Sequence, residues 1–333
     1  MVGLDAKCAA LPYDTKVLPH DLLVVANSSS SMDCPWGAPS PGCNQLDAAA
    51  PGGATRWSVF SDGFTQAATF LAGRGAALGI SFSPVVIAGG TICLGGHEDP
   101  LDVELPGSVD AVLKAIASKS RAGSSLLALP IEHATPLLQN YAFTHAPRRP
   151  ELAVVFDGES DFRPCFDETI ERAVTAASLA YQSKERIRTT VIGIGSDLVN
   201  LDVVAAAGGT NKARLINTGA RAEDGALAVA YALRAAATPC ELAFPDPIAP
   251  PGLLDPARLN IETALGNGTR RVALYNYPNA SWCQLGQGWY YDDPAKPTKV
   301  ILCPAACEPL SFEDAPVVTF LTGCPTRIAP PPP

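Results

Sequence analysis

The feature that most constrains the fold is an alternation of strand-like and helix-like runs between residues 21 and 236. Short continuous apolar runs are expected for strands that are buried on both faces. From Trp57 the apolar side chains recur every three or four residues, which is one face of a helix. This alternation predicts an α/β fold with a doubly wound, mostly parallel sheet. The expected strands are 21–26, 76–86, 152–156, 189–194 and 213–217, and the expected helices are 57–71, 109–117, 167–180, 201–207 and 224–236.

The pattern changes at Thr238. Five prolines from Phe244 to Pro256 indicate a stiff connector. Short β-type runs follow it, and two of these runs flank the turn signal Gly-Asn-Gly at 266–268. Five cysteines fall in this last part, whose core is small enough to need disulfides. We therefore expect four segments: an N-terminal extension (1–17), an α/β domain (18–238), a small, antiparallel, disulfide-stapled β module (239–329) and a proline tail (330–333).

The ten cysteines are even in number and include no Cys-x-x-Cys pair, and the four histidines are scattered. A zinc site is therefore disfavoured, and disulfides in an oxidising compartment are favoured over reduced thiols. The pairings we expect are Cys34–Cys43, Cys93–Cys165 and Cys283–Cys303. The sequence begins without a signal peptide, so an export signal is expected to have been removed. These features favour an extracellular or cell-surface location.

Several partner and activity classes are disfavoured. A net charge of −9 without clusters of Lys and Arg argues against nucleic acid. The longest apolar region, 70–96, contains Arg74, Pro84 and several glycines, so no transmembrane segment is expected. No nucleophile elbow, His-Glu-x-x-His helix or phosphate-binding glycine loop occurs, and we therefore expect a non-enzymatic protein.

Polar side chains follow two of the predicted strands. Asn27-Ser-Ser-Ser-Ser31 comes directly after 21–26, and Asp157 comes directly after 152–156. In a doubly wound sheet, ligands bind outside the carboxyl ends of the strands, near the point where the strand order reverses. The structural alternatives are a serine-rich turn and a turn-forming acid before Gly158.

Three stretches carry a resemblance to a known family. Residues 22–32 resemble the Asp-x-Ser-x-Ser-Met signature of von Willebrand factor A domains, and residues 154–159 resemble the Thr-Asp-Gly-Glu turn of that family, with Phe156 in place of Thr. Residues 191–195 and 201–210 are similar to its fifth strand and following helix. The resemblance covers 18–237. The tail, with Gly-Trp-Tyr-Tyr-Asp at 288–292, is similar to surface lipoproteins of the myxobacterial type that carry this domain.

The resemblance implies an adhesion or protein-binding module with a metal-ion-dependent adhesion site. In such a site Mg²⁺ or Mn²⁺ is held by hydroxyls, carboxylates and water, and an acidic residue of a protein partner completes the coordination. Ser124 is the alternative to Ser125 at the position where the family has threonine. Carried onto this chain, the metal ligands would be Asn27, Ser29, Ser31, Ser125 and Asp157.

The first of these positions departs from the family pattern, which has Asp where this chain has Asn27. An amide oxygen can ligate a cation but contributes no charge. Asp33 lies close in sequence and is a candidate to supply that charge. The alternative hypothesis is therefore a structural or assembly protein of the surface whose site is degenerate and metal-free.

Two aromatic features remain. Trp36 lies in a proline-rich loop after the serines, where it either anchors a binding partner or is tucked against the base of the loop. The run Trp289-Tyr290-Tyr291 is interpreted as core, with a sugar-binding platform as the alternative.

Overall fold

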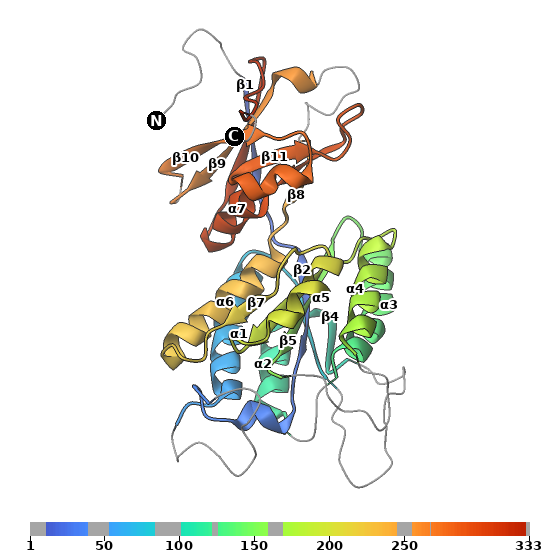
Figure 1. The fold of residues 1–333 in the computed structure, drawn as a ribbon, viewed down its shortest axis with the longest axis vertical. Coiled ribbons are helices and arrows are strands. Elements are labelled where there is room, and N and C mark those ends of the chain that lie inside the picture. The colour runs from blue at the N-terminus through green and yellow to red at the C-terminus, as the bar shows by residue number, and fades with distance from the viewer. Residues whose placement is uncertain are drawn as a thin grey trace. The chain divides into compact units, whose positions relative to one another are not determined.

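The computed structural model describes residues 11–38, 53–83, 101–121, 126–158, 169–244, 255–266 and 268–330. The chain separates into two compact units (Figure 1). We call His20–Ala237 the α/β unit, and Met1–Pro19 together with Thr238–Pro333 the β unit. Each unit is described by itself.

The α/β unit contains a six-stranded sheet in the order β4-β3-β2-β5-β6-β7. Neighbouring strands are parallel, except that β4 is antiparallel to β3 at the edge. The predicted α/β class is confirmed, and the sheet of this unit is mostly parallel. The strands are β2 (Asp21–Ala26), β3 (Leu78–Phe82), β4 (Val103–Gly107), β5 (Pro150–Phe156), β6 (Thr189–Ile194) and β7 (Arg214–Ile216).

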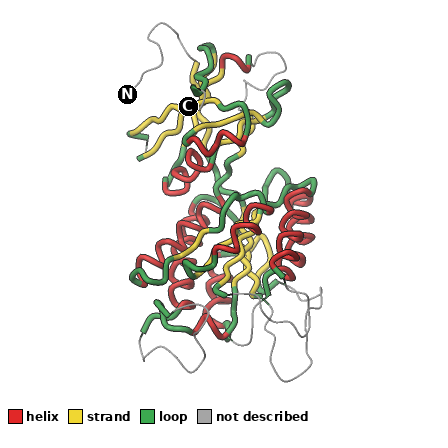
Figure 2. The backbone as a smooth tube through the Cα atoms, in the orientation of Figure 1, coloured by secondary structure: helices red, strands yellow, loops and turns green. Residues whose placement is uncertain are grey.

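Helices cover both faces of this sheet (Figure 2). One layer contains α1 (Arg56–Gly73), α2 (Val109–Ser118) and α6 (Ala222–Ala237), and the other contains α3 (Ala128–Thr144), α4 (Ile170–Gln182) and α5 (Asp202–Ala207). Along β2, Leu22 and Val24 pack into the first layer, whereas Leu23 and Val25 pack into the second. Burial on both faces explains why this strand is a continuous apolar run.

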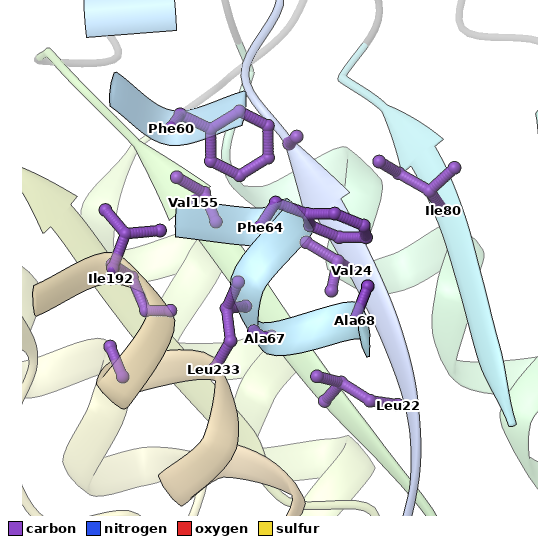
Figure 3. Close-up of a cluster of buried hydrophobic side chains, with 14 of the residues drawn as sticks. Leu22, Val24, Phe60, Phe64, Ala67, Ala68, Ile80, Val155, Ile192 and Leu233 are labelled. Atoms are coloured by element: carbon purple, nitrogen blue, oxygen red, sulfur yellow. The ribbon is translucent and has the colours of Figure 1, made fainter. Parts of the chain in front are cut away.

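The first layer forms a dense core in which the aromatic face of α1 packs onto the sheet. Figure 3 shows Phe60 and Phe64 of α1 beside Val24 of β2 and Val155 of β5. Helix α6 packs closely on α1 at Gly63, which has no side chain. A Cβ at this position would lie 2.4 Å from the Ala226 carbonyl oxygen. These contacts hold the first turn of α1 against the carboxyl ends of β2 and β5.

The β unit contains a seven-stranded sheet in the order β1-β13-β9-β10-β11-β12-β8. The antiparallel module expected from the sequence is corrected in one respect, because β10 and β11 are parallel and the sheet is mixed. The residues interpreted as an extension supply β1, which pairs with β13. The strands are β1 (Leu11–Lys16), β8 (Glu241–Ala243), β9 (Leu259–Leu265), β10 (Arg270–Asn276), β11 (Gly288–Tyr291), β12 (Lys299–Leu302) and β13 (Val317–Thr322), and a short helix, α7 (Pro304–Cys307), follows β12.

The predicted core role of the aromatic run is confirmed for two of its members. Trp289 is fully buried and Tyr291 is 8% exposed, and their rings meet edge to face at 5.0 Å. The Tyr291 hydroxyl donates to the Pro256 carbonyl oxygen at 3.0 Å, which satisfies its polar end. Tyr290, between them, is half-buried.

Two disulfides join described residues of the β unit. Cys283–Cys303 is the pairing expected from the sequence, and Cys240–Cys307 was not expected. Cys34 and Cys324 are also disulfide-bonded. The other two expected pairings involve Cys43, Cys93 and Cys165, which lie outside the described residues. Disulfides indicate an oxidising environment. Among the described helices, none combines the length and apolar character that crossing a membrane requires.

Candidate functional site

The candidate site lies at the reversal of strand order in the six-stranded sheet. From β2 the chain crosses to β3 on one side, and β5 lies on the other side of β2. Asn27 is the first residue after β2, and its backbone N–H donates to the Val155 carbonyl oxygen of β5 at 2.9 Å. Asp157 is the first residue after β5. The parallel pairing of β2 with β5 therefore brings the two polar segments together, as expected.

The side chains form a connected hydrogen-bond cluster. The Asn27 amide donates to Oδ1 of Asp157. The Ser31 hydroxyl donates to the same oxygen at 2.9 Å, and the Ser29 and Ser31 hydroxyls lie 2.6 Å apart. The Ser29 backbone N–H donates to the Asn27 amide oxygen at 2.7 Å, a local turn that orders the start of the loop. Four of the five predicted ligands, Asn27, Ser29, Ser31 and Asp157, thus lie together.

Arg56, the first residue of α1, belongs to the same cluster. Its Nη1 lies 3.0 Å from Oδ2 of Asp157 and donates also to the Asp157 carbonyl oxygen at 3.0 Å. Its Nη2 donates to the Ala38 carbonyl oxygen at 3.1 Å. Arg56 is 1% exposed and Asp157 is fully buried, so the ion pair between them is shielded from water.

The electrostatic environment of Asp157 reflects two opposing effects. Burial raises the pKa of the Asp157 carboxyl above its usual range, while the Arg56 guanidinium and the Ser31 hydroxyl act in the opposite direction. A buried carboxylate is tolerated when it is paired and accepts hydrogen bonds, and here both of its oxygens accept them. The cluster therefore holds one carboxylate and one guanidinium in direct contact.

In this arrangement the described residues differ from the ligand set of a divalent-cation site. A Mg²⁺ ion binds carboxylate oxygens at about 2.1 Å and favours oxygen ligands with negative charge. Here Oδ1 of Asp157 accepts from Asn27 and Ser31, and Oδ2 accepts from a guanidinium. The described residues contain no group of three or more His, Cys, Asp or Glu side chains suited to a metal ion. The predicted Mg²⁺ or Mn²⁺ site stays a prediction, and the pairing of Asp157 argues against it.

The remaining predicted residues are placed as follows. Ser125 and its alternative Ser124 lie outside the described residues. Asp33, the candidate for an additional charge, pairs instead with Arg121, whose Nε lies 2.6 Å from Oδ1 of Asp33.

Trp36 lies against the first turn of α6. Its indole N–H donates to the Ala220 carbonyl oxygen at 2.8 Å, and its ring occupies the space above Gly225, where a Cβ would lie 2.3 Å from Cζ2 of Trp36. The side chain is half-buried. Its role as an anchor for a partner stays a prediction, and its contacts attach the loop after β2 to α6.

The sequence interpretation missed Arg56. A signal was present, because Thr55 is a helix N-cap residue and Arg56 is therefore a cation at the N-terminus of a helix. The helix dipole disfavours a positive charge in that place. Such a residue implies a nearby negative charge that offsets the dipole, and Asp157 supplies it.

Comparisons with known proteins complete the description. No family model and no curated protein matches the chain. Among solved structures, von Willebrand factor type A from Catenulispora acidiphila is 12% identical with a TM-score of 0.44, over 98% of this chain and 68% of that one. Proximal thread matrix protein 1 from the mussel byssus, with a zinc-occupied MIDAS motif, is 14% identical with a TM-score of 0.43, over 70% of this chain and 50% of that one. The chain thus spans about half the length of the mussel protein. Manganese-loaded Plasmodium vivax TRAP protein is 13% identical with a TM-score of 0.39, over 66% and 76% of the two chains.

Proposed function

We propose that the α/β unit is a non-enzymatic protein-binding module. The partner would bind at the edge of the sheet where β2 and β5 end. The observation that carries this proposal is the convergence of Asn27, Ser31 and Asp157 from two loops at the reversal of strand order. Sheets of this topology bind their ligands at that place. A non-enzymatic role is supported by the Ser31 hydroxyl, which donates to a carboxylate already paired with Arg56 and not to an imidazole.

The surface that we assign to the partner surrounds the buried cluster. Ser30 and Ser31 are half-buried. Asp33, close to them in sequence, forms an ion pair with Arg121, and the two side chains are 43% and 30% exposed. Charged groups at the rim of an interface contribute mainly to the association rate and to specificity. We call Ser30, Ser31, Asp33 and Arg121 the loop face.

The experiment compares partner capture by three immobilised proteins. Wild type is compared with Arg121→Glu, which reverses a charge of the loop face, and with Lys184→Glu. Lys184 is an exposed cation between α4 and β6, at the amino-terminal edge of the sheet. A protein retained by wild type and by Lys184→Glu but lost with Arg121→Glu, and then shown to bind in purified form, supports the proposal. Equal retention by all three contradicts it.

A second candidate is the metal-dependent form of the same function. It is favoured by the hydroxyls of Ser29 and Ser31, which lie with Asp157 as they would in a metal-ion-dependent adhesion site. In this form the partner presents an acidic residue and capture is abolished by EDTA. A third reading, a structural or assembly protein, predicts that the loop face captures another copy of this chain.

We also propose an extracellular or cell-surface location. The disulfides Cys240–Cys307 and Cys283–Cys303 support it, because such bonds persist in oxidising compartments. A lipid anchor is the means of attachment that the similarity to surface lipoproteins would imply. Fractionation of the native host, followed by detection of the chain in envelope and medium, tests both points.

A further inference from the structure

We infer that Arg56 is the resident cation of the cluster and replaces a divalent ion, so that the loops after β2 and β5 are held together without metal. The inference concerns the site that the proposed function uses. It goes beyond that function because it assigns the positive charge of the site to a side chain of α1.

The Arg56 guanidinium reaches both segments that a metal ion would join: it donates to the carboxylate and carbonyl of Asp157 after β5 and to the Ala38 carbonyl after β2. The Arg56 backbone N–H donates to the Cys34 carbonyl oxygen at 3.0 Å, which fixes the base of the side chain. A planar guanidinium with several donors can bridge such acceptors, whereas a Lys ammonium is a point charge. Arg56 therefore performs by hydrogen bonds what a metal performs by ligation.

The charges of the cluster balance. Asp157 contributes one negative charge, Arg56 contributes one positive charge, and Asn27 is neutral. The net charge of these three groups is zero. A balanced charge is favoured here because an unpaired buried charge is costly. Adding a divalent ion to these three groups would raise their summed charge to about +2, and an uncompensated charge is costly in a buried place.

Residue 27 is an asparagine. Its amide donates to Oδ1 of Asp157, and an aspartate in that place would bring a second carboxylate against the first. One guanidinium balances only one carboxylate. Asn27 and Arg56 are thus a matched pair, and the departure of Asn27 from the motif has a physical reason.

Thermal unfolding tests the inference with no partner present. Wild type, Asn27→Asp/Arg56→Met and Lys184→Met are measured with EDTA and then with millimolar Mg²⁺ or Mn²⁺. Lys184→Met is the control for removal of an exposed cation. We expect no cation-dependent shift for wild type beyond that of the control. The double variant adds one carboxylate beside Asp157 and removes the guanidinium, so we expect a Tm increase of several degrees with Mn²⁺.

The outcomes are separable. If Mn²⁺ raises the Tm of wild type and Ser29→Ala abolishes the rise, the inference is overturned. A folded double variant that does not respond to Mg²⁺ or Mn²⁺ would also overturn it. If the double variant is unfolded in EDTA, recovery of far-ultraviolet circular dichroism on addition of Mn²⁺ replaces the Tm as readout, and absence of recovery counts against the inference. Because these readouts need no partner, failure here is distinct from failure of the capture experiment.

Discussion

Arg56 combines two unfavourable placements at the scale of a single residue. It is a cation at the positive end of the α1 dipole, and it is buried. The Asp157 carboxylate offsets both effects through direct contact, and the carbonyl oxygens of Asp157 and Ala38 satisfy further donors. The ion pair is therefore best regarded as a device that orients the loops, since buried pairs add little net stability relative to apolar residues.

Removal of one partner of this pair should be strongly destabilising. Arg56→Met leaves the Asp157 carboxylate buried without its counter-charge, and we expect the free energy of unfolding to fall by about 3–5 kcal/mol. Urea denaturation measures the change. Lys184→Met, on the exposed surface, should change stability by less than about 0.5 kcal/mol. A loss below about 1 kcal/mol for Arg56→Met would show that the pair is not formed as described.

The double variant Arg56→Met/Asp157→Asn separates charge from packing. It removes both charges, so it should be more stable than Arg56→Met alone. A double variant that is less stable than Arg56→Met would indicate that the buried carboxylate is held by other groups.

Glu151 sets a pH dependence at the opposite edge of the sheet. Burial alone would raise the pKa of its carboxyl, but Arg188 and His20 outweigh burial and hold the pKa below its usual range. His20 Nδ1 lies 2.7 Å from Oε1 of Glu151. Between the lowered folded pKa and the ordinary value of about 4.3, the unfolded chain binds more protons at this group. The free energy of unfolding therefore rises with pH in that window.

Glu151→Gln removes this titration. We expect the stability difference between wild type and Glu151→Gln to be larger at pH 7 than at pH 3, as measured by urea denaturation at both pH values. Glu171→Gln, on the exposed side of α4, is the matched control for the loss of an exposed carboxyl. A difference that is independent of pH would contradict the assigned ion pairs.

At the scale of the elements, α6 is placed by two glycines. Gly63 of α1 brings α6 close to α1, and Gly225 of α6 makes room for the Trp36 ring. The loop after β2 is thus attached to α6 by Trp36 and to α1 by Arg56.

Alanine substitution distinguishes Gly225, which packs against Trp36, from Gly73 at the end of α1. Gly225→Ala puts a methyl group 2.3 Å from Trp36 and should cost about 1–3 kcal/mol, because the indole must move. Gly73→Ala in α1 meets no atom within 4 Å and should be neutral or stabilising by up to about 1 kcal/mol. Thermal denaturation of both variants measures the contrast, and equal effects would refute the packing of Trp36 on α6.

Hydrophobic periodicity predicted the elements whose side chains are buried at regular intervals along the chain. The strand predicted at 21–26 is β2, and the helix predicted at 57–71 is α1, extended by a few residues. Strand β4 was missed because it is a half-exposed edge strand of five residues that contains Pro106. Strand β1 was missed because its partner, β13, lies some 300 residues away in sequence, and local pattern carries no information on such pairing.

At the scale of the whole molecule, each unit has its own hydrophobic core. The α/β unit has a core on each face of its sheet, and the β unit is built around Trp289 and Phe320. Cys240–Cys307 joins residues 67 apart within the β unit, and Cys283–Cys303 joins residues 20 apart. Loop-closure entropy predicts stabilisation of about 4 and about 3 kcal/mol respectively.

Loss of Cys240–Cys307, the disulfide that closes the longer loop, should therefore destabilise the β unit alone. In Cys240→Ser/Cys307→Ser we expect amide hydrogen exchange to become faster in β9 and β13 and to stay unchanged in β2 and β5. Hydrogen-exchange mass spectrometry of the double variant and of Cys283→Ser/Cys303→Ser makes the comparison. Faster exchange in β2 and β5 to the same extent would show that the units do not unfold separately.

The candidate site was predictable in part. The loops after β2 and β5 could be placed together because parallel strands end at one edge, and Asn27, Ser29, Ser31 and Asp157 do meet there. The counter-charge could not be read from the same motifs. Arg56 lies beyond the loop and reaches the cluster only because α1 packs across the sheet, which is a tertiary contact.

The most direct test of the central claim is a crystal structure of wild type grown with millimolar Mn²⁺, with anomalous scattering used to locate the metal. We predict the Arg56 guanidinium within hydrogen-bond distance of Asp157 and no manganese peak at that carboxylate. A manganese peak at about 2.1–2.2 Å from Asp157, with the hydroxyls of Ser29 and Ser31 as ligands and Arg56 displaced, would contradict the account.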